Sequence, residues 1–286
     1  MFFDNCLRQK NFLQNTVLNT QYTYDPGSRL TDANNAAAAI HYNYDALNRM
    51  DDARWTMNAL SYTLDYDYYQ NGLRKKIVYP QGKIVEYAYD ADDRVDLIKV
   101  NGVTLADYNY DALDRPQAKT LFTGSVQQQA AYSYDLADQL TNLGNTLLPS
   151  TKISQYSYPL YDKVGNRKTL TRTIGAAAGQ TINYGYNAIY ELTGVSGAQS
   201  FAYSYDGVGN RKTASSVNYT ANNLNQYSAV GGVTYGYDTN GNLISDGVNT
   251  YAYDEENRFK TLTAGATTAS YAYDAFNRRV SKTVNG

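Results

Sequence analysis

The sequence of 286 residues is poor in the residues that build many functional sites, with one cysteine, one histidine and one tryptophan. Because Cys6 stands alone, an intramolecular disulfide and a cysteine-rich metal site are both excluded. Charged residues make up 18% of the chain and the formal net charge is −2, a balance that gives no electrostatic signature of nucleic-acid binding or of an anionic membrane surface. No run approaches the roughly 18 apolar residues of a membrane helix. We therefore expect no nucleic-acid partner and no membrane span.

The first residues of the sequence do not have the pattern expected of a secretion signal. Asp4 interrupts the short apolar start MFFDNC, and no longer apolar run follows it. We expect synthesis in the cytoplasm. If the chain leaves the cell, it does so by another route or as part of a larger polypeptide.

Tyrosine is abundant, with 31 residues against 7 phenylalanines. Its ring favours β-strands, and its polar tip suits sheet faces that are half exposed to water. The tyrosines recur in a pattern: YAYDEENRF at 251–259 returns as YAYDAFNRR at 271–279. Further copies begin at Tyr22, Tyr42, Tyr87, Tyr108, Tyr132, Tyr203 and Tyr235, with degenerate ones at Tyr66, Tyr158, Tyr184 and Tyr219. We expect about 13 units at a spacing of about 21 residues, a repeat architecture.

Each unit has the composition of a β-hairpin. In Tyr-x-Tyr the two rings share one face of a strand, because side chains alternate. Asp and then turn-forming residues follow, and a second turn such as Asn101-Gly102 or Gln81-Gly82 closes the unit. The predicted fold class is all-β, with tandem β-hairpin repeats forming a curved, spiralling strip or partial β-shell. An irregular segment or partial first repeat at 1–21 precedes a single-domain array at 22–286.

These Y-x-Y-D-x-x-(G)-N-R units resemble the YD or RHS repeats. Such repeats occur in bacterial rearrangement-hotspot proteins, in the B and C components of insecticidal Tc toxin complexes, and in animal teneurins. The resemblance covers about Tyr22 to Gly286 and implies a strip of hairpins curled into a hollow shell, which in bacterial members encloses a toxin. It implies as partners other RHS/YD-repeat segments or an enclosed toxin polypeptide, and a secreted or cell-surface location within a larger system.

The sequence departs from the bacterial pattern at its carboxyl end. Bacterial members finish with an Asp-Pro-rich and Gly-rich plug at which self-cleavage frees the toxin. Here the only Asp-Pro is Asp25-Pro26, and a repeat is followed by Val284-Asn285-Gly286. We expect an array without plug or toxin, either a piece of a longer protein or a truncated reading frame. The predicted function is a structural wall segment that encapsulates or scaffolds a polypeptide, with no enzymatic activity.

The few residues that could serve catalysis or metal binding, His41, Cys6 and the acidic run 90–93, are better explained as structural or surface residues. His41 would have to serve any Ser-His-Asp or Cys-His arrangement, but its place beside Tyr42 favours a position on a strand surface. Cys6 has no base nearby in the sequence. Asp90-Ala-Asp-Asp93 could bind calcium, yet it lacks the spaced ligands of a dedicated loop. We predict no catalytic residue, no metal ligand and no cofactor.

The Asp at the same place in every unit is expected to stabilise the turn and to pair with an Arg of its own unit, such as Arg29, Arg115, Arg167 or Arg211. The Tyr rows are expected to form cross-strand ladders; the alternative is an exposed surface that binds carbohydrate. Open strand edges would favour self-association. The predicted structural motif comprises Tyr42, Tyr44, Asp45, Arg49, Tyr87, Tyr89, Asp90, Arg94, Tyr203, Tyr205, Asp206, Arg211, Tyr251, Tyr253, Asp254, Arg258, Tyr271, Tyr273, Asp274 and Arg278.

Overall fold

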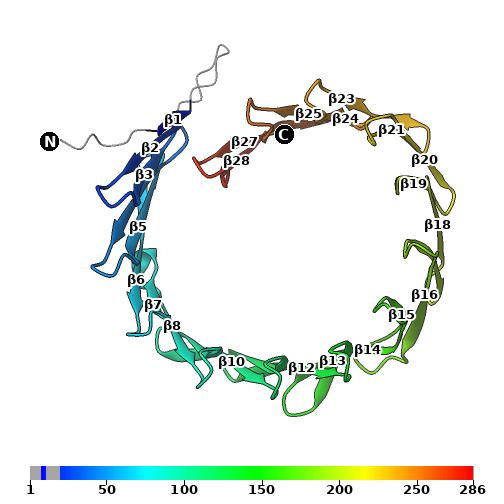
Figure 1. Ribbon diagram of the computed structural model, residues 1–286, viewed down its shortest axis with the longest axis horizontal. Coiled ribbons are helices and arrows are strands. Elements are labelled where there is room, and N and C mark those ends of the chain that lie inside the picture. The colour runs from blue at the N-terminus through cyan, green and yellow to red at the C-terminus, as the bar shows by residue number, and fades with distance from the viewer. Residues whose placement is uncertain (1–7, 11–19, 286) are drawn as a thin grey trace. The chain divides into compact units, whose positions relative to one another are not determined.

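The computed structural model describes residues 8–10 and 20–285, and these residues fold almost entirely into β-strands (Figure 1). The chain divides into two compact units. Unit 1 combines the segments 1–85 and 233–286, and unit 2 comprises 86–232. The all-β prediction and the prediction of tandem hairpins are confirmed.

Unit 1 contains two runs of antiparallel hairpins, one from each segment. Its strands pair with their neighbours in sequence, as in β2–β3, β4–β5 and β27–β28. The elements are β1 (Arg8–Lys10), β2 (Thr20–Tyr24), β3 (Leu30–Asn34), β4 (Ala39–Tyr44), β5 (Met50–Met57), β6 (Leu60–Tyr68), β7 (Arg74–Val78), the 3₁₀ turn η1 (Pro80–Gly82), the start of β8 (Ile84–Tyr89), β22 (Val233–Thr234), β23 (Gly236–Tyr237), β24 (Leu243–Ser245), β25 (Asn249–Tyr253), β26 (Phe259–Ala264), β27 (Thr267–Tyr273) and β28 (Arg279–Asn285).

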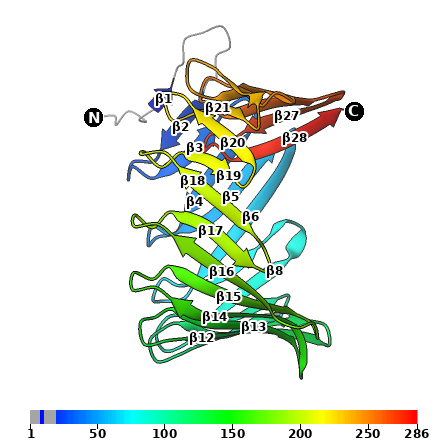
Figure 2. The same cartoon turned by 90° about the vertical axis from the view of Figure 1, so that its right-hand side faces the viewer.

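Unit 2 is a meander in which each strand from β9 to β21 pairs with the next. Figure 2 shows its strands from β12 to β19 side by side, with turns along both edges. Its strands are the rest of β8, β9 (Val95–Val100), β10 (Val103–Tyr110), β11 (Pro116–Thr123), β12 (Val126–Tyr134), β13 (Leu140–Leu147), β14 (Thr151–Tyr161), β15 (Arg167–Ile174), β16 (Gln180–Tyr186), β17 (Leu192–Gly197), β18 (Phe201–Tyr205), β19 (Arg211–Ala214), β20 (Val217–Ala221) and β21 (Tyr227–Val230).

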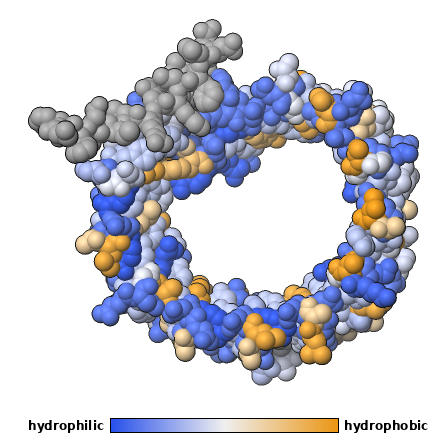
Figure 3. All heavy atoms as spheres, in the orientation of Figure 1, coloured by the Kyte–Doolittle hydropathy of each residue, from blue (hydrophilic) through white to orange (hydrophobic). Residues whose placement is uncertain are grey.

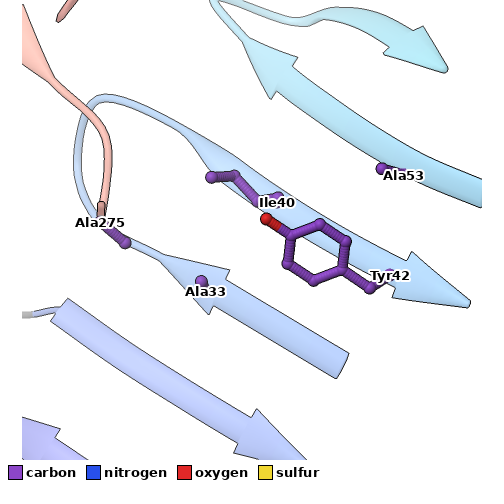
Figure 4. Close-up of a cluster of buried hydrophobic side chains, with 5 residues drawn as sticks. All are labelled: Ala33, Ile40, Tyr42, Ala53 and Ala275. Carbon is purple, nitrogen blue, oxygen red and sulfur yellow. The ribbon is translucent and has the colours of Figure 1, made fainter. Parts of the chain in front are cut away.

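The buried apolar residues form small clusters. In unit 1, Ala33, Ile40, Tyr42, Ala53 and Ala275 pack together (Figure 4). In unit 2 the corresponding cluster consists of Tyr158, Leu170, Ile182 and Val195. The face visible in Figure 3 carries separate apolar side chains among hydrophilic ones.

The predicted domain boundaries stay a prediction. Most of the segment 1–21 lies outside the described residues, although Arg8–Lys10 form β1 and pair with β2. The described part of the chain contains no helix that is long and apolar enough to cross a membrane.

Candidate functional site

The repeated five-residue turn that begins at Asp or its equivalent is the candidate site, and we call it the repeat turn. In the turn 45–49 the N–H of Asp45 donates to the Arg49 carbonyl (2.8 Å), and the N–H of Asn48 donates to the Asp45 carbonyl (3.1 Å). A register shift in the adjoining strand pair accompanies the turn. The same pair of backbone bonds occurs in the turns 25–29, 69–73, 79–83, 90–94, 111–115, 135–139, 162–166, 187–191, 206–210, 222–226, 238–242, 254–258 and 274–278.

The fourth residue of the repeat turn has a positive φ, 65° at Asn48 and 62° at Asn277. Asn, Asp and Gly adopt this left-handed conformation most readily, which explains their recurrence at this position. Ser28 and Tyr190 are the exceptions. The turn 79–83 corrects one prediction: Gln81-Gly82 belongs to a repeat turn, because Gly82 occupies its fourth position.

The Asp carboxylate closes the turn from within. At Asp45, Oδ1 accepts the N–H groups of Leu47 (2.8 Å) and Arg49 (2.9 Å), and Oδ2 accepts Nε of Arg49 (2.7 Å). Backbone donors near the first position would otherwise lack partners inside the tight turn. The same pairing of Asp with the Arg four residues later occurs at Asp25–Arg29, Asp90–Arg94, Asp111–Arg115, Asp254–Arg258 and Asp274–Arg278.

Arg167 and Arg211 do not fit this arrangement, and the expectation for them was wrong. In the sequence D-G-V-G-N-R, Gly209 takes the left-handed fourth position and Asn210 takes the fifth. Asn210 Nδ2 therefore donates to Asp206 Oδ2 (2.9 Å), while the Arg211 guanidinium lies over the ring of Tyr203 (5.2 Å). Asp162 pairs in the same way with Asn166.

The fifth-position Arg also reaches the next repeat. Arg29 Nη1 donates to Oδ1 of Asn48 (2.7 Å), and Arg258 Nη1 donates to Oδ1 of Asn277 (2.8 Å). Arg94 pairs with Asp114 in the same manner. The acceptor is the fourth residue of the following turn in each case, so one side chain fastens two successive turns.

The second Tyr of many units makes the reciprocal contact. The hydroxyl of Tyr44 donates to the carbonyl of Leu30 (2.7 Å), next to Arg29 of the preceding turn, and the Arg29 guanidinium lies 4.9 Å from the centre of the Tyr44 ring. Such a cation–π contact adds to the hydrogen bond. The same hydroxyl-to-carbonyl bond is made by Tyr68, Tyr110, Tyr134, Tyr161, Tyr186, Tyr205 and Tyr273.

Other motif residues have different partners. Tyr251 donates to Asp246 Oδ2 (2.5 Å), and this bond holds the pKa of Asp246 well below its ordinary value. The rings of Tyr251 and Tyr271 pack against Phe259. The Tyr–carbonyl and Arg–turn bonds between repeats were not predicted from the sequence. The constant spacing of Arg and the second Tyr in successive units could have indicated them.

The hydrogen bonds of the repeat turns lower the pKa values of the Asp carboxyls. The backbone N–H of Arg49 holds the pKa of Asp45 below the ordinary 3.8, and the Arg94 side chain does the same for Asp90. The pKa of Asp25, Asp111, Asp206 and Asp238 is also lowered by such hydrogen bonds. Burial raises the pKa of Tyr44 and Tyr110 above 10.0.

We expect the array to lose stability in acid. A carboxyl whose folded pKa lies below 3.8 stabilises the fold above that pH, and the contribution disappears as the pH falls through the folded pKa. The melting temperature should stay level down to about pH 5 and drop below about pH 4. In the double variant Asp45→Asn/Asp111→Asn the turn should still form, because the Asn side-chain oxygen accepts the same backbone N–H, as that of Asn187 does naturally. We expect its melting temperature to be lower at neutral pH and to fall less steeply in acid. An unchanged melting temperature at about pH 2.5 would contradict this account.

The candidates for catalysis and metal binding are placed as follows. His41 Nδ1 lies 2.7 Å from Asp32 Oδ1 on the neighbouring strand, and Cys6 lies outside the described residues. The carboxylates of Asp90 and Asp92 both contact Arg94. Among residues 8–10 and 20–285, no group of three or more His, Cys, Asp or Glu side chains is placed to hold a metal ion.

Unit 1 also contains an open cavity of about 480 Å³. Its lining includes Asn35, Asp254, Arg258, Lys260 and Tyr273. Arg258 already pairs with Asp254 (2.6 Å), and Asn35 Nδ2 donates to the Tyr273 carbonyl (2.9 Å). Three of these polar side chains thus already have partners within the protein, and the Asn35 bond joins two distant segments of unit 1.

Comparison with known proteins places this geometry in context. The family model described as Teneurin YD-shell matches residues 1–101 and 160–286. The tRNA nuclease WapA of Bacillus subtilis strain 168 and the tRNA3(Ser)-specific nuclease WapA of Bacillus spizizenii are each 40% identical over 95 residues, which is 29% of this chain and 4% of theirs. The chain thus spans a small part of the curated relatives it matches.

Solved structures that share the fold include two crystal structures of TcdB2-TccC3 complexes. The crystal structure of TcdB2-TccC3-Cdc42 aligns with a TM-score of 0.75 at 14% identity, covering 96% of this chain and 18% of that one. TcdB2-TccC3 aligns with a TM-score of 0.73 at 12% identity, covering 94% and 18%.

Proposed function

Because the chain belongs to the teneurin YD-shell family, we propose that it forms a stretch of shell wall that encloses or scaffolds another polypeptide. The family resemblance drawn from the sequence is confirmed by the matching family model, and this membership supports the structural shell role that we propose. The enclosed polypeptide, its nature as a toxin and a secreted location are parts of our proposal.

The observation that carries the proposal is the network between successive repeats. Arg258 binds Asp254 in its own turn and Asn277 in the next, and Tyr273 returns a hydrogen bond to the Phe259 carbonyl. Asp, Arg and Tyr side chains, which could serve chemistry elsewhere, form hydrogen bonds within or between the repeats in many of the units. Stability in such arrays comes from contacts between neighbouring repeats, which suits a wall.

We also propose that this stretch is not catalytic. Cleavage of tRNA is named for the WapA relatives, but the matched residues are 4% of those proteins. In this chain His41 is the only histidine, and it pairs with Asp32 on a strand surface. The described carboxylates of the repeat turns serve the same structural bonds in turn after turn.

The carbohydrate-binding alternative receives less support and stays a prediction. A sugar would stack on free tyrosine faces, yet guanidinium groups lie over the rings of Tyr44, Tyr68 and Tyr134. Their hydroxyls donate to carbonyls of the preceding repeat.

Limited proteolysis tests the wall function. We expect the protein purified from its source cells to retain a polypeptide segment, either covalently continuous or bound, that resists protease while the wall is folded. Heating the wall through its melting transition should make this segment cleavable, because proteolysis follows opening of the structure. A destabilised variant, Ile40→Ala, should expose the segment at a lower temperature. Cleavage at the same rate before and after melting would contradict enclosure.

A further inference from the structure

The turn 274–278 differs from the other repeat turns because it is docked. Within unit 1, Ala275 is only 8% exposed and lies among residues of β3, β4 and β5 (Figure 4). The Tyr22 hydroxyl donates to the Ala275 carbonyl (2.7 Å). The Phe276 ring packs 6.2 Å from the ring of Tyr22 and 6.3 Å from that of Tyr42, distances at which aromatic pairs attract.

The surface that receives this turn consists of Tyr22, Ala33, Tyr42 and Ala53, and we call it the seat. Ala33 lies opposite Tyr22 and Ala53 opposite Tyr42 in the strand register, and both alanines are 0% exposed. A methyl group at these positions leaves room beside each ring for the incoming turn. Larger side chains stand opposite the first Tyr in the pairs Tyr132–Leu143, Tyr184–Val195 and Tyr251–Leu262, whereas Tyr203 also has an alanine, Ala214, opposite it.

Polar contacts fix the docked turn at both ends. Asn35 Nδ2 donates to the carbonyl of Tyr273 (2.9 Å), just before the turn. At its last residue, the Arg278 guanidinium lies 5.7 Å from the centre of the Trp55 ring. Asp274 is 1% exposed, and its carboxylate accepts the N–H groups of Phe276 and Arg278. The contact therefore recognises the shape of a complete repeat turn.

Two other turns carry the same sequence pattern, Asp, Ala, an apolar residue, Asn or Asp, and Arg. They are Asp45–Arg49 in unit 1 and Asp111–Arg115 in unit 2. Their third residues are exposed, Leu47 at 68% and Leu113 at 66%, and Ala46 and Ala112 are exposed as well. These turns share backbone and side-chain bonding with 274–278 and lack only a covering surface.

We propose that the seat is a docking site for repeat turns of this pattern, and that 45–49 and 111–115 dock on the seat of a second copy of the chain when that seat is free. In a single chain, the turn 274–278 fills the seat and blocks it. The tether gives this turn a high effective concentration, so a second copy competes only after the turn is released. The proposal concerns how repeat stretches join and stands whether or not the wall encloses a polypeptide.

Analytical ultracentrifugation of the full chain tests the exchange. Phe276→Asp places a charge between Tyr22 and Tyr42 and should release the turn. We expect the weight-average sedimentation coefficient of this variant to rise with protein concentration more steeply than that of the wild type. Adding Leu47→Asp and Leu113→Asp should abolish the extra rise. Ala275→Gln, which overfills the seat, should reproduce the effect of Phe276→Asp if the variant chain retains its β circular dichroism.

Matched substitutions on the opposite edge of the hairpins distinguish this contact from non-specific association through exposed apolar side chains. Leu60 and Val103 are 59% and 71% exposed and directly follow the two-residue turns 58–59 and 101–102, which are not repeat turns. Leu60→Asp with Val103→Asp should leave the extra association intact. If the extra association persists after Leu47→Asp and Leu113→Asp, it arises from open strand edges and not from these turns. If a folded Phe276→Asp variant associates no more than the wild type, the seat binds no second copy. Either result overturns the proposal.

Discussion

Replacing Ile40 by alanine is expected to lower the free energy of unfolding of unit 1 by about 3 kcal/mol. Ile40 is 1% exposed and packs with Ala33, Tyr42 and Ala53. Its removal leaves a cavity in a small cluster that has few neighbours able to fill it, so both the transfer free energy and the packing are lost. Trp55, the single tryptophan, lies directly opposite Ile40 in the strand register, so its fluorescence during urea unfolding reports the effect at this position.

Leu47→Ala supplies the control, because Leu47 is 68% exposed in the same run of hairpins. Its substitution should change the free energy of unfolding by no more than about 0.5 kcal/mol. A loss below about 1 kcal/mol for Ile40→Ala would mean that the cluster closes over the missing side chain or contributes little to stability.

The local structure could be predicted because it depends on residues close in sequence. Tyr-x-Tyr before Asp indicates a strand followed by a turn, and the structure places β4 and a repeat turn at Tyr42–Arg49. The wrong expectations for Arg167 and Arg211 arose from the position of these residues relative to the turn. In D-G-V-G-N-R the glycine takes the left-handed position, which moves the Arg one place beyond the turn, so Asn210 replaces Arg211 as the partner of Asp206.

Contacts between distant residues could not be predicted. The Tyr22 hydroxyl meets the carbonyl of Ala275, 253 residues away, and nothing in the two repeats distinguishes this pairing from others with the same letters. It depends on the small side chains of Ala33 and Ala53 opposite two tyrosines, and that register emerges only when the hairpins are built. The seat was therefore invisible in a repeat pattern that averages over units.

Replacing Gly197 by alanine is expected to destabilise the β16–β17 hairpin of unit 2 by about 3 kcal/mol. Gly197 ends β17 with a φ of 100°, and an added Cβ would lie 2.3 Å from the carbonyl oxygen of Thr181. That oxygen accepts the N–H of Ala198 (2.8 Å), so moving it away also breaks a hydrogen bond at the end of the hairpin opposite its turn. Hydrogen exchange of the amides in β16 and β17 measures the loss of local stability.

Gly265→Ala separates the clash from the backbone strain, because Gly265 also has a positive φ (58°) but an added Cβ would meet no atom within 4 Å. It should cost about 1 kcal/mol, the strain alone. Gly247→Ala should fall between the two, since its added Cβ would meet the Val233 side chain, which can rotate, rather than a backbone oxygen. An equal loss of stability in Gly197→Ala and Gly265→Ala would show that the β16–β17 backbone shifts freely to avoid the clash. The fixed register of this hairpin would then not depend on Gly197.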